Sequence, residues 1–252
     1  MKYAPFKLIG LNRPNNIICI CDHASNLVPD FWSKNGLGIK KSEMGRHIAF
    51  DLGAKRLTKK LSRLLNGPAI LSNFSRLVID PNRGKNDPTL IMKLYDGTII
   101  PENREVNEIE KLRRLNQYYK PYHNVIKSVI NSRKCPIIIS IHSFTPKLKN
   151  GHQRPWEIGV LHTIDRRLSN DLLVELRKDR ALCIGDNLPY SGDLPGDTLD
   201  QHCIPSNHLH ALIELRNDLL ANEMLINHWA NYLASKILKV VKHSTIKRIK
   251  NG

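Results

Sequence analysis

The sequence predicts a single α/β domain built on a mostly parallel β-sheet. Short apolar runs, several of them nearly continuous isoleucine, valine and leucine, alternate with longer segments of helical periodicity. Continuous apolar runs are typical of strands buried on both faces. Alternation of strand and helix indicates parallel strands joined by crossover helices. A chain of 252 residues can form one large domain or two small ones, and the order of elements favours one, residues 1–252, ending in a basic tail from about 240.

Seven short segments have the apolar character of buried strands, and four longer segments have the periodicity of amphipathic helices. The predicted strands are 17–21, 69–72, 76–80, 136–141, 157–162, 182–185 and 210–215. The predicted helices are 43–65, 105–132, 167–179 and 217–240. Two polar segments, 81–104 and 186–208, are predicted to be long surface loops. Loops of this length are uncommon in compact domains unless they are functional.

The charge is strongly positive, with 39 lysines and arginines against 23 aspartates and glutamates and a formal net charge of +16. Such a charge raises nucleic-acid binding as a function. However, the positive residues are spread along the whole chain, only 6% of residues are aromatic, and no nucleic-acid-binding motif is present. We therefore expect a lysine-rich surface without a nucleic-acid partner, and keep binding of nucleic acid or another anionic polymer as the alternative.

The cysteines and the absence of long apolar runs indicate a cytoplasmic protein. The five cysteines include no C-x-x-C pair and fit reduced, buried thiols better than disulfides or a cysteine-based zinc site; they are Cys19, Cys21, Cys135, Cys183 and Cys203. No apolar run approaches the roughly 20 residues of a membrane span. The first 16 residues lack the apolar region of a secretory signal. We expect no membrane association.

Polar residues cluster at the ends of four predicted strands. His23 follows the predicted strand 17–21, Asn82 and Arg83 follow 76–80, and His142 follows 136–141. Glu214 lies within the last strand, and Arg216 comes just after it. Since ligands of open α/β sheets bind at the carboxyl ends of the strands, we expect a functional site there.

The two histidines suggest a metal site. A hydrolytic zinc site has three protein ligands and an open position for water, and His23 and His142 could supply two of them. His47 and Asp51 are four residues apart on one face of the predicted helix 43–65, so either could be the third ligand, with the other beside it. A hydrogen bond between a helical histidine and aspartate, without metal, is the structural alternative.

Glu214 interrupts an otherwise apolar strand. An unpaired buried carboxylate is costly, and burial raises its pKa, which suits a general base that activates water. The alternative is a structural ion pair with Arg216, because alternate residues of a strand share a face. Asn82, Arg83 and Arg76 could bind a substrate carboxylate, since arginine binds carboxylates in a bidentate manner. Otherwise they form a turn anchored by Asp80.

Eight ordered segments carry a family resemblance. They are CDHASNLVP, RHIAFDLGA, FSRLVIDPNRG, SIHSFTP, RPWEIGVLH, GDNLPYSG, TLDQH and IELRNDL. Together, over roughly residues 10–235, they resemble the less characterised branch of the N-formylglutamate amidohydrolase family. That family is similar to zinc carboxypeptidases and aspartoacylases. The resemblance implies a three-layer α/β/α fold of the phosphorylase/hydrolase-like type, with a mostly parallel mixed sheet.

The resemblance also implies an activity and a set of residue roles. The activity is hydrolysis of N-formyl-L-glutamate or a similar N-acyl amino acid, with a divalent metal, zinc in the first place, as cofactor. The implied metal ligands are His23, His142 and either His47 or Asp51, and Glu214 would activate water. The implied substrate-binding residues are Asn82, Arg83, Arg76, Arg216, His202, Arg154 and Tyr190. The chain departs from the better-known branch at Asp22-His23-Ala24-Ser25, where that branch carries a Pro-His-x-Gly type motif.

Overall fold

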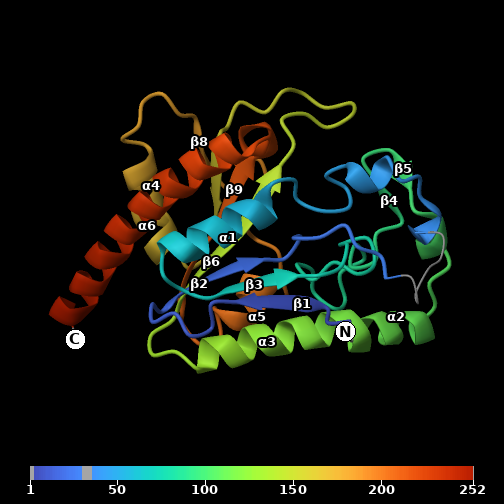
Figure 1. Ribbon diagram of the computed structural model, residues 1–252, viewed down its shortest axis with the longest axis horizontal. Coiled ribbons are helices and arrows are strands. Elements are labelled where there is room, and N and C mark those ends of the chain that lie inside the picture. The colour runs from blue at the N-terminus through green and yellow to red at the C-terminus, as the bar shows by residue number, and fades with distance from the viewer. Residues whose placement is uncertain (1–2, 30–35, 252) are drawn as a thin grey trace.

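A mixed, mostly parallel sheet forms the centre of the molecule. The computed structural model describes residues 3–29 and 36–251, with side chains described as far as Lys242. In the described chain the sheet has seven strands in the order β1-β3-β2-β6-β9-β7-β8 (Figure 1). The strands are β1 (Phe6–Ile9), β2 (Ile17–Cys21), β3 (Ala69–Ser72), β6 (Ile137–Phe144), β7 (Ile158–Leu161), β8 (Ile184–Asp186) and β9 (Leu209–Arg216).

Four adjacent strands, β3, β2, β6 and β9, run parallel to one another. The edge strand β1 is antiparallel to β3, and β7 is antiparallel to β9, with β8 parallel to β7. The predicted α/β class with a mostly parallel mixed sheet is therefore confirmed.

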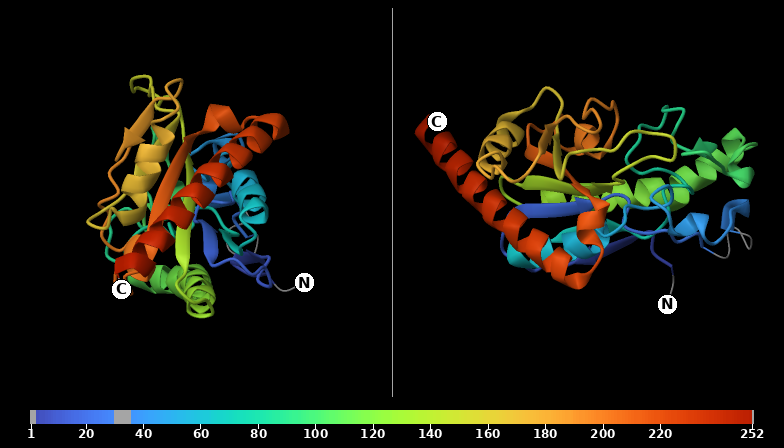
Figure 2. Two further views of the ribbon diagram at one scale, coloured as in Figure 1. Left: turned by 90° about the vertical axis from the view of Figure 1, so that its left-hand side faces the viewer. Right: turned by 90° about the horizontal axis from the view of Figure 1, so that it is seen from above.

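Helices cover both faces of this sheet, which gives three layers (Figures 1 and 2). On one face α1 (Ala54–Leu64), α4 (Arg167–Leu176) and α6 (Glu223–Asn251) pack on alternate strand residues such as Ile17 and Cys19. On the other face α3 (Lys120–Asn131) and α5 (Thr198–His202) pack on the intervening residues, such as Ile18 and Ile20. The alternation within β2 thus places one strand in two hydrophobic cores, as its continuous apolar sequence predicted.

Two predicted elements differ from the structure. Residues 76–80 form turns rather than a strand, although Leu77, Val78 and Ile79 are fully buried. The predicted helix 43–65 begins only at Ala54; before it lie a short 3-10 helix, η2 (Glu43–Gly45), and a series of turns. The predicted helix 105–132 is confirmed, since the chain is helical from Glu108 to Asn131 as α2 (Glu108–Arg114), a π-helical segment (Leu115–Tyr119) and α3.

The structure also adds elements that the sequence did not predict. The edge strand β1 lies near the N-terminus, and the predicted loop 81–104 contains a hairpin of β4 (Leu94–Tyr95) and β5 (Thr98–Ile99). Further 3-10 segments are η1 (Gly36–Gly38), η3 (Pro101–Asn103) and η5 (Asn217–Leu220). The last helix continues to Asn251, beyond the predicted end at 240, and its C-terminal end projects past the sheet (Figure 2).

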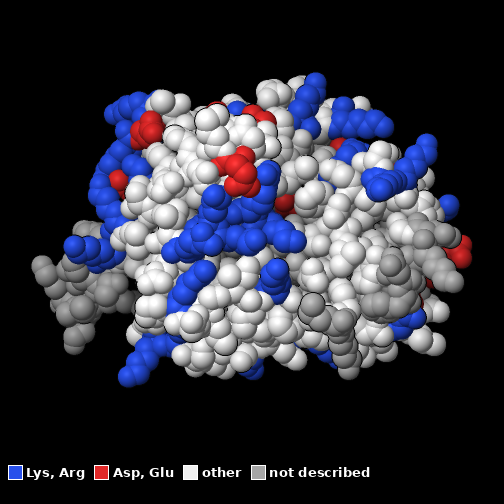
Figure 3. All heavy atoms as spheres, viewed as in Figure 1, with Lys and Arg blue, Asp and Glu red and all other residues white. Residues whose placement is uncertain are grey.

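Part of the positive charge gathers on the outer face of α1 (Figure 3). There the helix sequence AKRLTKKLSRL places five basic residues on its exposed side, while Leu57 and Leu61 face the core. Of the five cysteines, Cys19, Cys21 and Cys203 are buried as expected, but Cys135 and Cys183 are exposed. Among the described residues, no helix has the length and apolar character to cross a membrane.

Candidate active site

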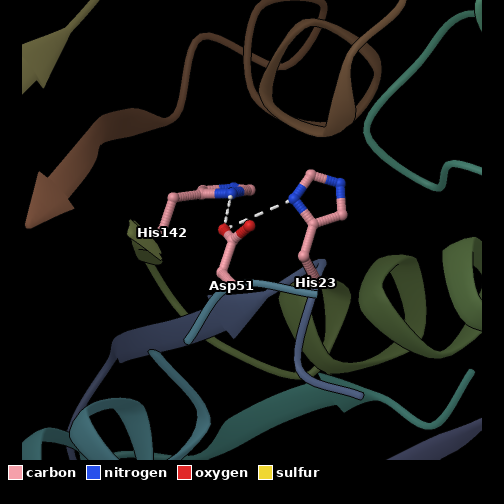
Figure 4. Close-up of side chains that lie close together, drawn as sticks. All are labelled: His23, Asp51 and His142. Atoms are coloured by element: carbon pink, nitrogen blue, oxygen red, sulfur yellow. Dashed lines mark hydrogen bonds and ion pairs between the residues drawn. The ribbon is translucent and has the colours of Figure 1, made fainter. Parts of the chain in front are cut away.

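Three potential metal ligands meet at the carboxyl ends of β2 and β6 (Figure 4). His23 follows β2, His142 lies near the end of β6, and Asp51 comes from the turn before α1. One nitrogen of each imidazole and one oxygen of the carboxylate lie within 4.8 Å of one another. The Nδ1 atoms of His142 and His23 are 2.9 Å and 3.4 Å from the same Asp51 oxygen, Oδ2. All three side chains are buried.

Backbone contacts hold Asp51 in this position. Its amide donates to the carbonyl of His23 at 2.9 Å, and its Oδ2 accepts the amide of Ser143 at 3.2 Å. Gly53, two residues later, has a φ of 81°, and a Cβ there would lie only 2.3 Å from the Leu220 Cβ. A left-handed residue in such close packing must be glycine. This glycine ends the turn and starts α1, so that Asp51 reaches the histidines from outside the helix.

The outer nitrogen of each histidine faces a second carboxylate. His23 Nε2 lies 2.7 Å from Asp80 Oδ1, and His142 Nε2 lies 3.2 Å from Asp22 Oδ2. Arg76 in turn donates to Asp80 Oδ2 from Nε at 3.1 Å and from Nη2 at 2.7 Å. A carboxylate behind a histidine fixes the ring and its tautomer, so that the other nitrogen presents a lone pair. Both Nδ1 atoms face Asp51 Oδ2, where they could serve as donors to a metal that replaces a proton.

The electrostatics of this cluster suit a bound cation. Burial alone would raise the pKa of Asp51, but His23 and His142 lower it well below its usual range. Burial would likewise lower the pKa of His142, yet its hydrogen bonds to Asp22 and Asp51 raise it well above its usual value. His23 Nδ1 is buried and has no hydrogen-bond partner among the described residues. A buried donor atom left open inside a negatively charged cluster fits a metal ion, which would satisfy it.

Glu214 stands directly beside His142, since the two residues are paired across β6 and β9. Its side chain is buried, and within the described chain Oε2 has no hydrogen-bond partner. Burial raises its pKa to about 7, although His142 opposes that shift. The alternative ion pair with Arg216 is not formed: Arg216 donates to Asp218 Oδ1 at 2.9 Å and to Glu157 Oε1 at 3.2 Å.

A cavity of about 320 Å³ opens over this cluster. Nine of the residues proposed from the sequence line it: His23, His47, Asp51, Arg76, Asn82, Arg83, His142, Tyr190 and Glu214. Arg83 is held there by bonds from Nε to Thr89 Oγ1 at 3.1 Å and from Nη1 to the Asn82 carbonyl at 3.0 Å. Asn82 Oδ1 accepts the amide of Thr198 at 3.1 Å, which ties its turn to α5. Arg154 lies at the edge, where its Nη1 donates to the Tyr190 hydroxyl at 2.9 Å.

Three residues proposed from the sequence occupy other places. His47 is not on a helix with Asp51; it lies 3.5 Å from Asp96 Oδ2 and does not belong to the His23–Asp51–His142 group, although it lines the cavity. Arg216 and His202 are not among the residues that line this cavity. His202 instead lines a second cavity, where its Nε2 lies 2.9 Å from His123 Nδ1.

The sequence did not indicate a role for Asp22 or Asp197, and it did not indicate that Asp80 would be the partner of a histidine. Asp22 accepts the hydroxyls of Thr198 at 2.7 Å and Tyr122 at 3.0 Å in addition to facing His142. Asp197 caps α5 by accepting the amide of Asp200, lines the cavity, and has its pKa raised to about 7 by burial. The available signal was an aspartate at the end of a buried apolar run: Asp22 follows β2, and Asp80 follows the buried Leu77, Val78 and Ile79. No sequence pattern indicated which histidine each would support.

Comparisons with known proteins identify the family and the fold. A model of the N-formylglutamate amidohydrolase family matches residues 15–221. Among solved structures, gene product Atu2144 from Agrobacterium tumefaciens matches with a TM-score of 0.89 and 30% identity, covering 95% of each chain. The N-formylglutamate amidohydrolase from Ralstonia eutropha matches in fold with a TM-score of 0.71 and 20% identity, covering 97% of this chain and 100% of that one. A search of curated proteins found no match. The chain thus belongs to the N-formylglutamate amidohydrolase family, hydrolases that act on amide carbon–nitrogen bonds.

Proposed function

We propose that the protein is a metal-dependent amidohydrolase that cleaves the amide bond of N-formyl-L-glutamate or a similar N-acyl amino acid. The products would be formate, or another acid, and the free amino acid. The observation that carries the proposal is the pairing of Glu214, with its open carboxylate oxygen, beside His142 of the His23–Asp51–His142 group. One cavity is then lined by the proposed general base Glu214, by the proposed metal donors and by the positively charged Arg83.

His23, Asp51 and His142 are the residues that would hold the metal. Two imidazoles and one carboxylate suit zinc, and several other divalent ions as well. When bound, such an ion would polarise the scissile carbonyl and lower the pKa of water toward about 7. Asp80 and Asp22 would keep both imidazole rings turned toward the centre.

Glu214 would move the protons. As a carboxylate it accepts a proton from the attacking water, and as a carboxylic acid it returns that proton to the leaving nitrogen. A pKa of about 7, raised by burial, makes both forms accessible near neutral pH. Its position on a strand, rather than on a loop, fixes the carboxylate relative to His142.

Arg83 and Asn82 would bind the substrate's α-carboxylate. Arg83 lines the cavity, and its described bonds, from Nε and Nη1, leave Nη2 open toward a ligand. Arg76 is already committed to Asp80 through two bonds, so its main task would be to position that carboxylate. Tyr190, bonded to Arg154, would line the outer part of the site. A volume of about 320 Å³ suits a small amino-acid derivative.

The test combines metal loading with a substrate screen. The purified protein is stripped with a chelator, reloaded with zinc, cobalt or manganese, and offered N-formyl and N-acetyl amino acids, with release of amine as the readout. We expect activity on acidic N-acyl amino acids that falls at least 100-fold in Glu214→Gln. Glu108→Gln, at an exposed carboxylate of α2, is the matched control. Absence of bound divalent metal together with absence of activity lost in Glu214→Gln would overturn the proposal.

A further inference from the structure

A second cavity, of about 410 Å³, lies between α3 and α5 and shares no lining residue with the catalytic cavity. Three lysines line it: Lys85, Lys120 and Lys127. No aspartate or glutamate is among its lining residues, so every formal charge on its wall is positive. Three side-chain amides, of Asn124, Asn131 and Gln201, add hydrogen-bonding groups. A concave site with unbalanced positive charge favours an anion.

Two stacked histidines form the inner part of this wall. The rings of His123 and His202 lie 5.1 Å apart between centroids and 23° from parallel. His123 Nε2 is 3.0 Å from the Pro81 carbonyl, which can only accept, so this nitrogen carries the proton of the bond. Burial lowers the pKa of His123 to about 3, which makes the ring neutral and its Nδ1 an acceptor. His202 Nε2, 2.9 Å away, must then be the donor to it.

This series of hydrogen bonds leaves His202 Nδ1 as an acceptor. Burial lowers the pKa of His202 to about 4, so its ring is also neutral and carries its one proton on Nε2. Within the described chain, no residue donates a hydrogen bond to His202 Nδ1. A residue of the cavity wall therefore offers an open lone pair next to lysine ammonium groups.

The lysines lie close enough to act on these rings. Lys127 contributes to the lowered pKa of His202, and Lys85 to that of His123. Lys120 donates to Asn116 at 2.7 Å, whereas Lys85 and Lys127 have no ion-pair partner among the described residues. Lysine is a common point-charge ligand for phosphate, while planar carboxylates are more often bound by the arginine fork that this wall lacks. A phosphomonoester titrates near pH 6, so one form also carries an O–H that the open nitrogen can accept.

We propose that this cavity binds a phosphate-bearing small molecule, with Lys85 and Lys127 neutralising its charge and His202 Nδ1 accepting its hydrogen bond. The site is distinct from the catalytic cavity, but the two are connected through His123. This residue bonds to the carbonyl of Pro81, which directly precedes Asn82 and Arg83. The binding itself does not depend on which substrate the enzyme hydrolyses.

The experiment measures binding of inorganic phosphate and of glycerol 3-phosphate to the full chain by titration calorimetry in sodium chloride buffer. We expect Lys85→Gln and Lys127→Gln each to weaken binding about 10-fold. Lys59→Gln, which removes the same charge from the exposed face of α1, is expected to leave it unchanged. Correlated ¹H–¹⁵N spectra of the imidazoles should show a shift of the His202 Nδ1 signal on binding.

Three results would overturn the proposal. The first is that neither phosphate compound binds when it is present at millimolar concentration and in at least 10-fold excess over the protein. The second is that Lys85→Gln and Lys127→Gln bind phosphate as tightly as Lys59→Gln does. That result would place the anion elsewhere, for example at the catalytic cluster. The third is acetate binding as tightly as phosphate, which would make carboxylates the ligand class. Circular dichroism checks that each variant is folded, as expected because these lysines are exposed.

Discussion

Glu214 and His142 occupy paired positions on adjacent parallel strands, so main-chain hydrogen bonds set the distance between them. Asp51 and His23 reach the same point from turns, but both are tied to this frame by backbone contacts. The chemistry proposed for the site needs a carboxylate held close to the metal donors without bonding to them. A strand pair satisfies that need more rigidly than two loops would.

Asp80→Asn should weaken metal binding by about 10- to 100-fold, because the carboxylate behind His23 sets the ring orientation and its basicity. Competition with a chromophoric chelator measures the affinity. Glu105→Gln, at an exposed carboxylate, should have no effect. Equal metal affinities of Asp80→Asn and Glu105→Gln would show that Asp80 acts only as the ion-pair partner of Arg76.

Arg83→Ala should raise KM for an N-acyl amino acid by about 10- to 100-fold with a smaller change in kcat, because it removes a carboxylate contact made before and during the reaction. Steady-state kinetics on the substrate found by the screen provide the measurement. Arg177→Ala, at an exposed arginine after α4, is the matched control. If kcat fell while KM stayed constant, Arg83 would act in the transition state instead.

Gly53→Ala should destabilise the protein by about 2 kcal/mol or more. An L-residue at a φ of 81° is strained, and the new methyl group would approach Leu220 to 2.3 Å. Denaturant unfolding gives the change in free energy of unfolding. Gly45→Ala, where a Cβ would meet no atom within 4 Å, should cost much less. Metal affinity should also fall in Gly53→Ala, since Asp51 lies only two residues before it.

The stability of the protein should decrease as pH falls from about 6.5 to about 4, partly because of His123 and His202. Burial lowers the pKa of these rings to about 3 and about 4, whereas the unfolded chain titrates near 6.5. In that window the unfolded state binds more protons, so each ring lowers the free energy of unfolding by at most about 1.4 kcal/mol per pH unit.

His202→Gln removes one of the two groups and should make this dependence shallower. Urea unfolding of both proteins at several pH values in phosphate-free buffer supplies the slopes. Protonation of carboxylates such as Asp51 also destabilises the protein in acid, but it does so equally in both proteins. The difference between the two slopes therefore reports the contribution of the His202 imidazole. Parallel slopes for the two proteins would mean that the pKa of His202 is the same in the folded and unfolded chain.

The central sheet and two candidate metal ligands could be predicted because they depend on local sequence pattern. Continuous apolar runs marked β2, β6 and β9, and the rule that ligands bind at strand ends led to His23, His142 and Glu214. The segment around Leu77 was misjudged for the same reason, since a short buried apolar run has no periodicity to distinguish a strand from turns.

The rest depended on contacts between distant segments. Helical spacing extended back through Leu52 and Ile48, but the left-handed Gly53, packed closely on Leu220, is the N-cap of α1, so the helix begins only after Asp51. His47 and Asp51 therefore could not be distinguished from sequence. Arg216 likewise shares a strand with Glu214, yet its partners Glu157 and Asp218 draw it away from the cavity. Such choices are made by tertiary structure.

The order of strands also has a consequence for synthesis of the protein. All three candidate metal ligands lie within the first 142 residues, whereas Glu214 belongs to β9, which lies between β6 and β7 in the sheet. In a nascent chain whose residues 209–216 are still inside the ribosome, β6 and β7 therefore lack the strand that pairs with both of them. The residue proposed to transfer protons lies on the strand that joins the two parts of the sheet, so neither the sheet nor the proposed site can be complete before residues 209–216 are made.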